Sequence, residues 1–246
     1  MDTLLKHVTI RNFSDRPVSD EILEQILNCG VRASTTGNMQ WYSIVVTTGP
    51  DMKNRLAPYH FNQNVAKTAP VLLTFCADIN RFNLWCIINN AIPGYNNFLS
   101  FFNAAIDALL VAQNVCIAAE NVGLGICYLG TTTYNAPEII ELLQLPRLVV
   151  PVTTVALGWP AEFPDLTDRL PLEAVVHKET YKNYSEDQIL RLYSAKESLD
   201  SSKKFIAENN KENLAQVFTD VRYKKPDNEF FSEKLLTALK NQGFLE

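Results

Sequence analysis

The sequence lacks the patterns of cysteine and histidine that bind metals or form a disulfide framework. Its three histidines lie far apart, and its five cysteines are odd in number and contain no C-x-x-C pair. Most of the cysteines lie inside apolar stretches, which indicates reduced and buried thiols. A zinc or haem site therefore has no support, and reduced cysteines are typical of a cytoplasmic protein.

The sequence also lacks an excess of positive charge, because its formal net charge is −5 at pH 7. A protein that binds nucleic acid needs a basic face for the phosphate backbone, so we expect no nucleic-acid partner. No apolar run is long and uninterrupted enough to predict a transmembrane helix, and no basic-then-apolar leader begins the chain. These absences predict a cytoplasmic protein without a membrane partner.

What the sequence does contain is a hydrophobic fraction of 47% over 246 residues, which can form a sizeable core. Ser19, followed by two acidic residues, predicts the start of a helix. Apolar and β-branched runs predict strands at residues 44–48, 71–77, 126–129 and 149–157. Because helices precede, separate and follow these strands, the sequence indicates an α+β fold with a central sheet.

Residues 103–121 predict a helix with apolar side chains on nearly every side. The segment is too short, and too interrupted by Asp107, Gln113 and Asn114, to span a membrane. A helix that is apolar all round is usually buried, and its many alanines allow another helix to approach closely. We therefore expect this helix in the core and at a dimer interface.

The composition becomes more polar after residue 180. A capping box formed by Ser185 and Gln188 predicts the start of a polar helix. The segment has too few large apolar residues to form a second core. We therefore predict a main domain over residues 1–180, and a helical arm over residues 181–246 that packs on the body or on a partner subunit.

Two further helices and one loop can be placed by local signals. Asn135 and Glu138 predict a capped helix that Pro146 ends. Residues 220–228 predict a loop, and residues 229–242 predict an amphipathic helix that glycine stops. The side chains expected on its inner face are Leu235, Leu236 and Leu239.

Three glycines surround the predicted strand at 126–129. Gly123, Gly125 and Gly130 have the spacing G-x-G-x-x-x-x-G, which differs from the G-x-G-x-x-G of dinucleotide-binding proteins. They also precede a strand, whereas the dinucleotide motif follows one and opens a helix. Taken alone, these glycines are better explained as residues of the connection between a helix and a strand.

Polar side chains cluster near the N-terminus. Strand-like alternation would place His7, Thr9 and Arg11 on one side, and Val8 and Ile10 on the other. An imidazole, a hydroxyl and a guanidinium together can hold a phosphate or the polar edge of a ring. An edge strand with a solvated polar face explains this segment equally well.

Two other segments are rich in hydrogen-bonding groups. Residues 32–41 form a loop of small polar residues, which suits close approach to a planar ligand, although such loops are common connections. Residues 61–65 contain three amide side chains, which match the donor and acceptor pattern of a pyrimidine-like ring. An ordinary helix cap is the commoner explanation of the second segment.

Together, in this order, these segments resemble the nitroreductase and NAD(P)H–flavin oxidoreductase family over most of residues 1–180. The string LGWPAE at 157–162, with PDL at 164–166 and RLP at 169–171, is the most specific part of the match. The branch it resembles comprises bacterial NADPH nitroreductases and flavin reductases with a long C-terminal arm. The resemblance implies a mostly antiparallel sheet flanked by helices, a homodimer with exchanged arms, FMN as cofactor, and NADPH or NADH as reductant.

The resemblance also implies the contacts of FMN. They involve its phosphate, the edges of its ring, and a loop that reaches the flavin of the other subunit. The phosphate would bind His7, Thr9 and Arg169. Arg11 would contact the N1–C2=O edge of the ring and Gln63 its O4–N3 edge, and N5 and O4 would contact the backbone of Tyr128, Leu129, Gly130 and Thr131. The loop that reaches the flavin of the other subunit would comprise Thr35, Thr36, Gly37 and Asn38.

This chain departs from the branch at two positions near the expected phosphate. Val8 stands where a second basic residue is usual beside His7, and Thr167 stands where a lysine usually precedes Arg169. The phosphate would therefore meet less positive charge than in relatives. Lys203, Lys204, Arg222, Lys224 and Lys225 are all candidates for contacting the nicotinamide cofactor.

The resemblance implies an FMN-dependent enzyme that reduces nitroaromatics, quinones or free flavin by a ping-pong mechanism. Flavin chemistry needs no side chain as general acid, so we expect no catalytic residue in the strict sense. Alternatives within the same fold are a flavin-dependent dehalogenase and an enzyme that supplies reduced flavin. A further alternative is an FMN-binding store or redox sensor without turnover.

Overall fold

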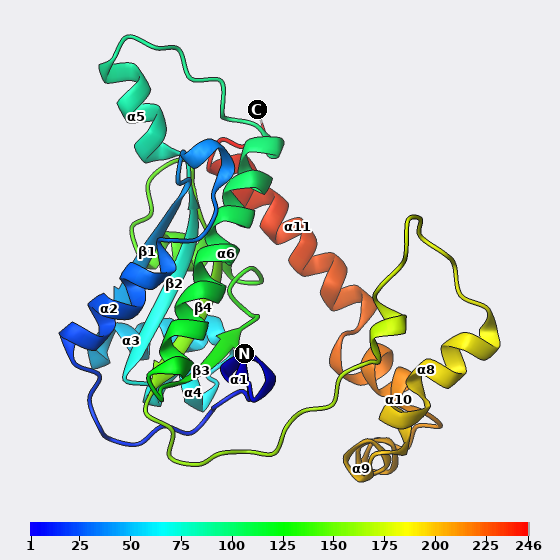
Figure 1. Ribbon diagram of the computed structural model, residues 1–246. Coiled ribbons are helices and arrows are strands. Elements are labelled where there is room, and N and C mark those ends of the chain that lie inside the picture. Colours follow the sequence, from blue (N-terminus) through cyan, green and yellow to red (C-terminus); the bar gives the residue numbers. More distant parts are fainter. Residues whose placement is uncertain (246) are drawn as a thin grey trace. The chain divides into compact units, whose positions relative to one another are not determined.

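The computed structural model describes residues 1–245, which form two compact units (Figure 1). Unit 1 contains Met1–Asp165 and the residues from Phe231 onward, and unit 2 is Leu166–Phe230. All the strands lie in unit 1, whereas unit 2 is helical. The boundary predicted after residue 180, between a cofactor-binding domain and a C-terminal arm, stays a prediction.

Unit 1 is built on a four-stranded sheet in the order β1-β2-β4-β3, and every neighbouring pair is antiparallel. The sheet confirms the predicted α+β fold and the four predicted strands, with ends shifted by at most two residues. Every residue of β2 is buried, as expected of a central strand covered on both faces. The strands are β1 (Tyr42–Thr47), β2 (Val71–Asp78), β3 (Gly125–Leu129) and β4 (Val149–Gly158).

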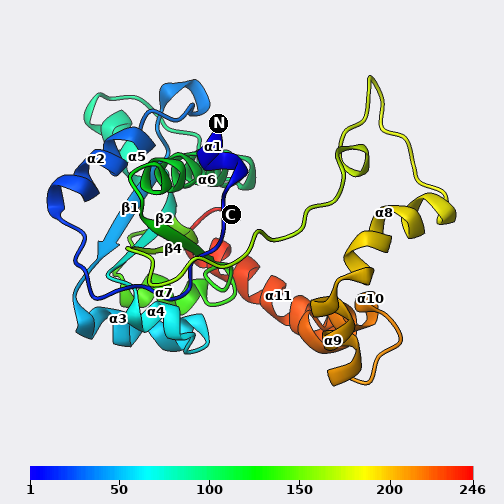
Figure 2. The same ribbon diagram turned by 60° about the horizontal axis from the view of Figure 1, so that its bottom comes forward.

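Two helices, α2 (Asp20–Gly30) and α6 (Phe98–Asn121), cover one face of the sheet (Figures 1 and 2). Helix α2 begins as predicted, since the Ser19 hydroxyl accepts a hydrogen bond from the backbone of Ile22. Helix α6 begins five residues before the predicted start at 103, because the Asn97 side chain caps it. Their apolar side chains interlock with those of β2 and β4 to form the main core.

The prediction that helix α6 is too short and too interrupted to span a membrane was wrong, because α6 starts five residues earlier than predicted. It is the one helix found in residues 1–245 that is long and apolar enough to cross a membrane by length and composition. Its inner face nevertheless packs in the core of unit 1, through residues such as Ala108, Val111 and Val115. Such packing is typical of a core helix, so the composition of α6 does not by itself indicate a membrane. The predicted burial of this helix is confirmed on that inner face.

Gly30 allows α2 and α6 to approach closely, because a Cβ atom at this position would lie 2.3 Å from Cγ2 of Val115. We expect Gly30→Ala to lower the free energy of unfolding by about 2 kcal/mol, as overpacking of a core usually does. Urea denaturation measures the change. Gly49→Ala is the matched control, because a Cβ there would meet no atom within 4 Å. Equal stability of the two variants would contradict the packing argument.

Short helices cover the other face of the sheet. Their side chains form a second core with Leu72, Leu129 and Ala156 of the strands. The alternation of β2, where Leu72 faces one core and Leu73 the other, places this layer opposite α6. These elements are α3 (Pro50–Leu56), the 3-10 helix η2 (Ala57–His60), α4 (Asn64–Thr68) and α7 (Ala136–Leu142).

Helix α11 (Lys225–Asn241) begins in unit 2 and ends in unit 1. Leu239 and the following Phe244 are buried in a third core with Trp41 and Val150. Gly243 ends the segment with a φ of +87°, as the predicted glycine stop requires. The remaining elements of unit 1 are α1 (Asp2–Leu5), the 3-10 helix η1 (Thr36–Asn38) and α5 (Asn80–Ile88).

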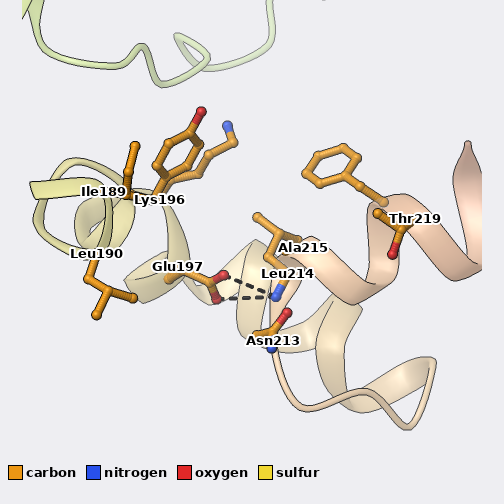
Figure 3. A pocket seen from close by; sticks show the side chains of 10 residues that line it. Ile189, Leu190, Lys196, Glu197, Asn213, Leu214, Ala215 and Thr219 are labelled. Atoms are coloured by element: carbon orange, nitrogen blue, oxygen red, sulfur yellow. Dashed lines mark hydrogen bonds between the residues drawn. The ribbon is translucent and has the colours of Figure 1, made fainter. Parts of the chain in front are cut away.

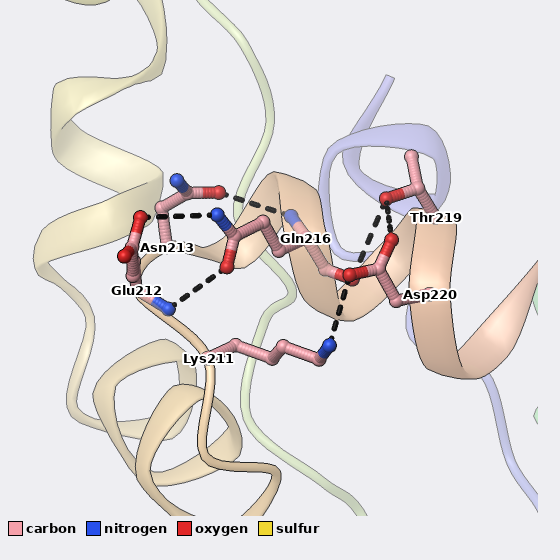
Figure 4. A network of polar contacts seen from close by, with 6 residues as sticks. All are labelled: Lys211, Glu212, Asn213, Gln216, Thr219 and Asp220. Carbon is pink, nitrogen blue, oxygen red and sulfur yellow. Dashed lines mark hydrogen bonds and ion pairs between the residues drawn. The ribbon is translucent and has the colours of Figure 1, made fainter.

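Unit 2 consists of the 3-10 helix η3 (Leu172–Ala174), α8 (Glu186–Ser198), α9 (Asp200–Glu208), α10 (Leu214–Val217), the π-helix η4 (Phe218–Arg222) and the start of α11. The predicted capping box opens α8, because Ser185 and Gln188 bond reciprocally. A surface network that includes the 2.9 Å pair Lys211–Asp220 links the loop before α10 to η4 (Figure 4).

Three local predictions were wrong. The predicted loop at 220–228 is largely helical, because η4 runs to Arg222 and α11 starts at Lys225. The Asn135 side chain does not cap α7, since tertiary contacts use its amide, and α7 ends at Leu142, before Pro146. Leu236, predicted to point inward, is 48% exposed.

Candidate cofactor site

The N-terminal polar segment runs beside β3. Thr9 forms a parallel bridge with Ile126, and the backbone N–H of Ile10 donates to the Ile126 carbonyl at 2.9 Å. Burial raises the pKa of the Cys127 thiol, and the positive charge of Arg11 opposes that rise. Arg11 is exposed, and its guanidinium has no hydrogen bond or ion pair within residues 1–245. A cation thus lies beside β3 without a partner from unit 1.

The imidazole of His7 contacts a carboxylate that the sequence pattern did not indicate. Its Nδ1 lies 2.6 Å from Oε1 of Glu120, near the end of α6. Ile10 is buried on the opposite side, in accord with the predicted alternation of the segment. The Glu120 contact leaves Nε2 of His7 for any phosphate, and the phosphate-binding roles of His7 and Thr9 stay predictions.

The loop that carries Gln63 is tied to the end of β3 by a buried histidine. Nδ1 of His60 lies 2.9 Å from the Thr131 hydroxyl, and the Asn135 amide donates to the Tyr59 carbonyl at 2.7 Å. Gln63 is exposed, and its side chain has no hydrogen bond within the described part of the chain. The structure therefore brings Gln63 and Thr131, two predicted FMN contacts, onto adjacent loops.

Burial lowers the pKa of His60 from 6.5 to about 4, and its Nε2 is buried without a hydrogen-bond partner in the described part of the chain. The folded protein keeps this imidazole neutral, whereas the unfolded chain protonates it below about pH 6.5. We expect the free energy of unfolding to fall as the pH drops from 6.5 towards 4, by up to about 1.4 kcal/mol per pH unit from this group. Above pH 6.5 His60 should contribute no pH dependence.

Urea denaturation at several pH values measures this slope. His60→Gln should flatten it, because glutamine does not titrate. A slope that survives in His60→Gln would assign the acid sensitivity to other groups.

The turn after β3 combines buried and open positions. Leu129 and Thr131 are buried, and the Thr132 hydroxyl donates to the Leu129 carbonyl at 2.9 Å. Gly130 is exposed, and a Cβ there would meet no atom within 4 Å. Burial raises the pKa of Tyr128, whose hydroxyl donates to Gln113 at 3.4 Å. The backbone at Gly130 is therefore accessible to a ligand.

The loop predicted to reach the other subunit's flavin is held by Asp107 of α6. Its carboxylate is 1% exposed and accepts hydrogen bonds from the Thr36 backbone, the Thr36 hydroxyl and the Trp41 backbone, at 2.9, 3.1 and 3.2 Å. Gly37 and Asn38 at the tip of the loop are exposed and have φ of +55°. Sequence reasoning treated Asp107 only as an interruption and missed this contact.

Arg169 lies in unit 2, so its predicted place at the FMN phosphate stays a prediction. Its guanidinium donates to the carbonyls of Thr167 and Asp168 at 3.2 and 2.9 Å. The Asp168 carboxylate pairs with Lys196 at 2.8 Å. The sequence did not indicate Lys196, which brings a second cation close to the position where Thr167 replaces the usual lysine.

Unit 2 also contains a largely apolar cavity of about 730 Å³ between α8 and α10 (Figure 3). Ile189, Leu190 and Leu214 contribute apolar surface, and the Glu197 carboxylate accepts two contacts from the Leu214 backbone N–H at 3.1 and 3.3 Å. None of the predicted FMN contacts lines this cavity. Within residues 1–245, no group of His, Cys, Asp and Glu side chains could hold a metal ion.

Comparison with known proteins agrees with the resemblance seen in the sequence. The chain is 35% identical over 191 residues to the oxygen-insensitive NADPH nitroreductase of Salmonella typhimurium, with 78% of each chain covered. It is 34% identical over 189 residues to an FMN reductase (NADPH) of Bacillus subtilis, with 76% of each covered. A crystal structure of a Bacteroides fragilis protein assigned as an oxidoreductase has 55% identity and a TM-score of 0.99 over 100% of both chains.

The model of the nitroreductase family matches residues 4–159, which include the whole sheet and the loops carrying Arg11, Gln63 and Thr131. The match thus covers more than half of the chain, and it coincides with unit 1 rather than with the helical unit. On this evidence the chain belongs to the nitroreductase family.

Proposed function

We propose that this protein is an FMN-dependent oxidoreductase that uses NADPH or NADH to reduce nitroaromatics, quinones or free flavin. The observation that supports it most is the meeting of three segments at the end of β3. Arg11 lies beside the strand, the Gly130 turn follows it, and His60 ties the Gln63 loop to that turn. The relatives named for NADPH nitroreductase and FMN reductase activities support the same reaction class.

The groups at this place fit the polar parts of FMN. Arg11 and Gln63 are exposed, and their side chains lack partners within residues 1–245, so both can bind a ligand without breaking an existing contact. The open backbone at Gly130 can approach a planar ring. A cation, an amide and backbone N–H groups are the donors that the carbonyls and nitrogens of a flavin edge require.

FMN, when bound, takes a hydride from the nicotinamide cofactor and passes the electrons to the acceptor. The residues of this chain would bind and orient it. Arg11 would hold a fixed positive charge near N1, where negative charge increases on reduction. Gln63 would fix the O4–N3 edge, and the backbone from Tyr128 to Thr131 would support the ring near N5.

A cytoplasmic homodimer is part of the proposal. The outer face of α6 exposes a stripe of large apolar side chains, each 39–67% exposed in the single chain. A stripe of this extent normally marks an interface. Its members are Phe98, Leu99, Phe102, Ile106, Leu109 and Leu110. Light scattering should give twice 27.7 kDa at micromolar concentration, and a 27.7 kDa particle would contradict the dimer.

Purification provides the direct test of the proposed function. The protein should be yellow, release FMN on denaturation, and oxidise NADPH steadily with menadione or a nitrofuran as acceptor. A colourless protein that does not bind added FMN would refute the proposal. Binding of FMN without turnover would instead identify a store or redox sensor, and stopped-flow reduction with each nicotinamide would establish whether NADPH or NADH is preferred.

Thr167→Lys should tighten FMN binding about tenfold, because a charge-assisted hydrogen bond to phosphate contributes about 1.5–3 kcal/mol when well formed. Asp168 already engages Lys196, so that lysine is not fully available to the phosphate. Titration of the apoprotein with FMN measures the affinity, and Thr167→Gln is the uncharged control. Equal affinity of the lysine variant and the wild type would place residue 167 away from the phosphate or show that Lys196 already supplies the charge.

A further inference from the structure

The part of α11 that lies in unit 1 contacts both loops at the end of β3. The ring of Phe231 stacks on Tyr134, with centroids 4.5 Å apart and planes inclined by 10°. The Phe61 ring lies 6.0 Å from Phe231 and 6.3 Å from Tyr134. Phe61 precedes Gln63 by two residues, and Tyr134 follows Thr131 by three. One aromatic side chain of α11 therefore packs against the loops that carry both predicted contacts.

A lysine one turn further along α11 makes polar contacts at the start of α7, a few residues after Thr131. The ammonium group of Lys234 lies 2.6 Å from Oε1 of Glu138 and donates to Oδ1 of Asn135 at 2.9 Å. The same Asn135 side chain donates to the Tyr59 carbonyl at 2.7 Å. Lys234 is thereby linked, through one amide, to the loop that holds His60 and Gln63.

These polar contacts are partly shielded from water. The side chain of Lys234 is 20% exposed and that of Glu138 is 36% exposed. The second carboxylate oxygen of Glu138, Oε2, is buried and has no hydrogen-bond partner within residues 1–245. Removal of Lys234 would leave this carboxylate without its cation, which costs more than the loss of an exposed surface pair.

We propose that Phe231 and Lys234 form a C-terminal clasp that fixes the Gln63 loop and the Thr131 turn relative to each other for binding of the flavin ring. This inference rests on the proposed function. Lys234 is a positioning residue, because it acts through Asn135 and Glu138 rather than on the ring. A ring held at two edges binds tightly only when the donors on both edges are correctly spaced, so loosening the clasp weakens binding without removing any donor.

The test compares Lys234→Met, which keeps most of the apolar stem, with Lys234→Arg, which keeps the charge. Lys240→Met is the matched control, because Lys240 lies on the same helix, is exposed and has no partner within residues 1–245. The readouts are the FMN dissociation constant of each apoprotein, the visible circular dichroism of bound FMN, and the urea midpoint of the apoprotein.

We expect Lys234→Met to raise the dissociation constant about tenfold and to alter the circular dichroism of the flavin, as loss of one charge-assisted contact implies. Lys234→Arg should restore both properties, and Lys240→Met should match the wild type. A Lys234→Met protein that is less stable but binds FMN with unchanged affinity and spectrum would show a purely structural role and overturn the clasp.

Phe231→Leu keeps the test decisive if Lys234→Met does not fold. It removes the stacked ring but retains apolar volume, and it carries the same expectation for affinity and spectrum. Unchanged FMN binding in this variant would also overturn the clasp. A wild-type protein that fails to bind FMN would refute the proposed function itself, whereas normal binding by the wild type and by both variants would refute only the clasp.

Discussion

Arg11→Ala is expected to slow reduction of the bound flavin by NADPH about 100-fold, with little change in stability. Removal of one preorganised group that stabilises developing charge typically lowers a rate by about 100-fold to 1,000-fold. Arg11 is exposed and has no partner within residues 1–245, so the folded chain loses no internal contact in the variant. The midpoint potential of the flavin should fall together with the rate.

Stopped-flow absorbance at the flavin band measures the rate, and a redox titration measures the potential. Arg11→Lys should recover part of both, since it keeps the charge but not the planar fork of donors. Arg55→Ala, at an exposed position of α3, controls for the loss of one positive charge from unit 1. An unchanged potential in Arg11→Ala would place Arg11 at the phosphate or on the surface instead of near N1.

Asp107→Ala should lower the free energy of unfolding by about 3 kcal/mol, because it leaves the partly buried donors of Thr36 and the buried backbone N–H of Trp41 without an acceptor. The loop tip at Gly37 and Asn38 should become mobile as a result. If this loop reaches the flavin of the other subunit, the dissociation constant of FMN should also rise.

Urea denaturation and FMN titration of the apoprotein measure the two effects. Asp15→Ala is the control, because that carboxylate is exposed and has no hydrogen bond or ion pair within residues 1–245. A loss of stability with unchanged FMN affinity would limit Asp107 to a structural role and would remove the loop from the flavin site.

Elements with strong local signals could be predicted from the sequence. The runs that became β2 and β4 consist mostly of apolar or β-branched residues, because both strands are covered on two faces. Ser19 and Ser185 occupy cap positions that depend only on neighbouring residues, and both cap their helices. The family resemblance likewise rests on short contiguous segments, of which the most specific lies within residues 157–171.

Contacts between distant residues could not be predicted in this way. Asp107 accepts hydrogen bonds from a loop about 70 residues earlier in the sequence, and His60 bonds the Thr131 hydroxyl. Lys234 donates to the side-chain oxygen of Asn135, which would otherwise be available to cap α7. In each case the residue type is compatible with an ordinary local role. Only the packing of the sheet and its helices determines which polar groups become neighbours.

The buried position of Phe244 has a consequence for biosynthesis. The Phe244 ring and the Leu239 side chain complete a core whose other buried members come from residues 41–150, so synthesis must pass residue 244 before this core can close. During translation the partly formed sheet would expose apolar surface near Trp41 and Val150, where chaperones can bind.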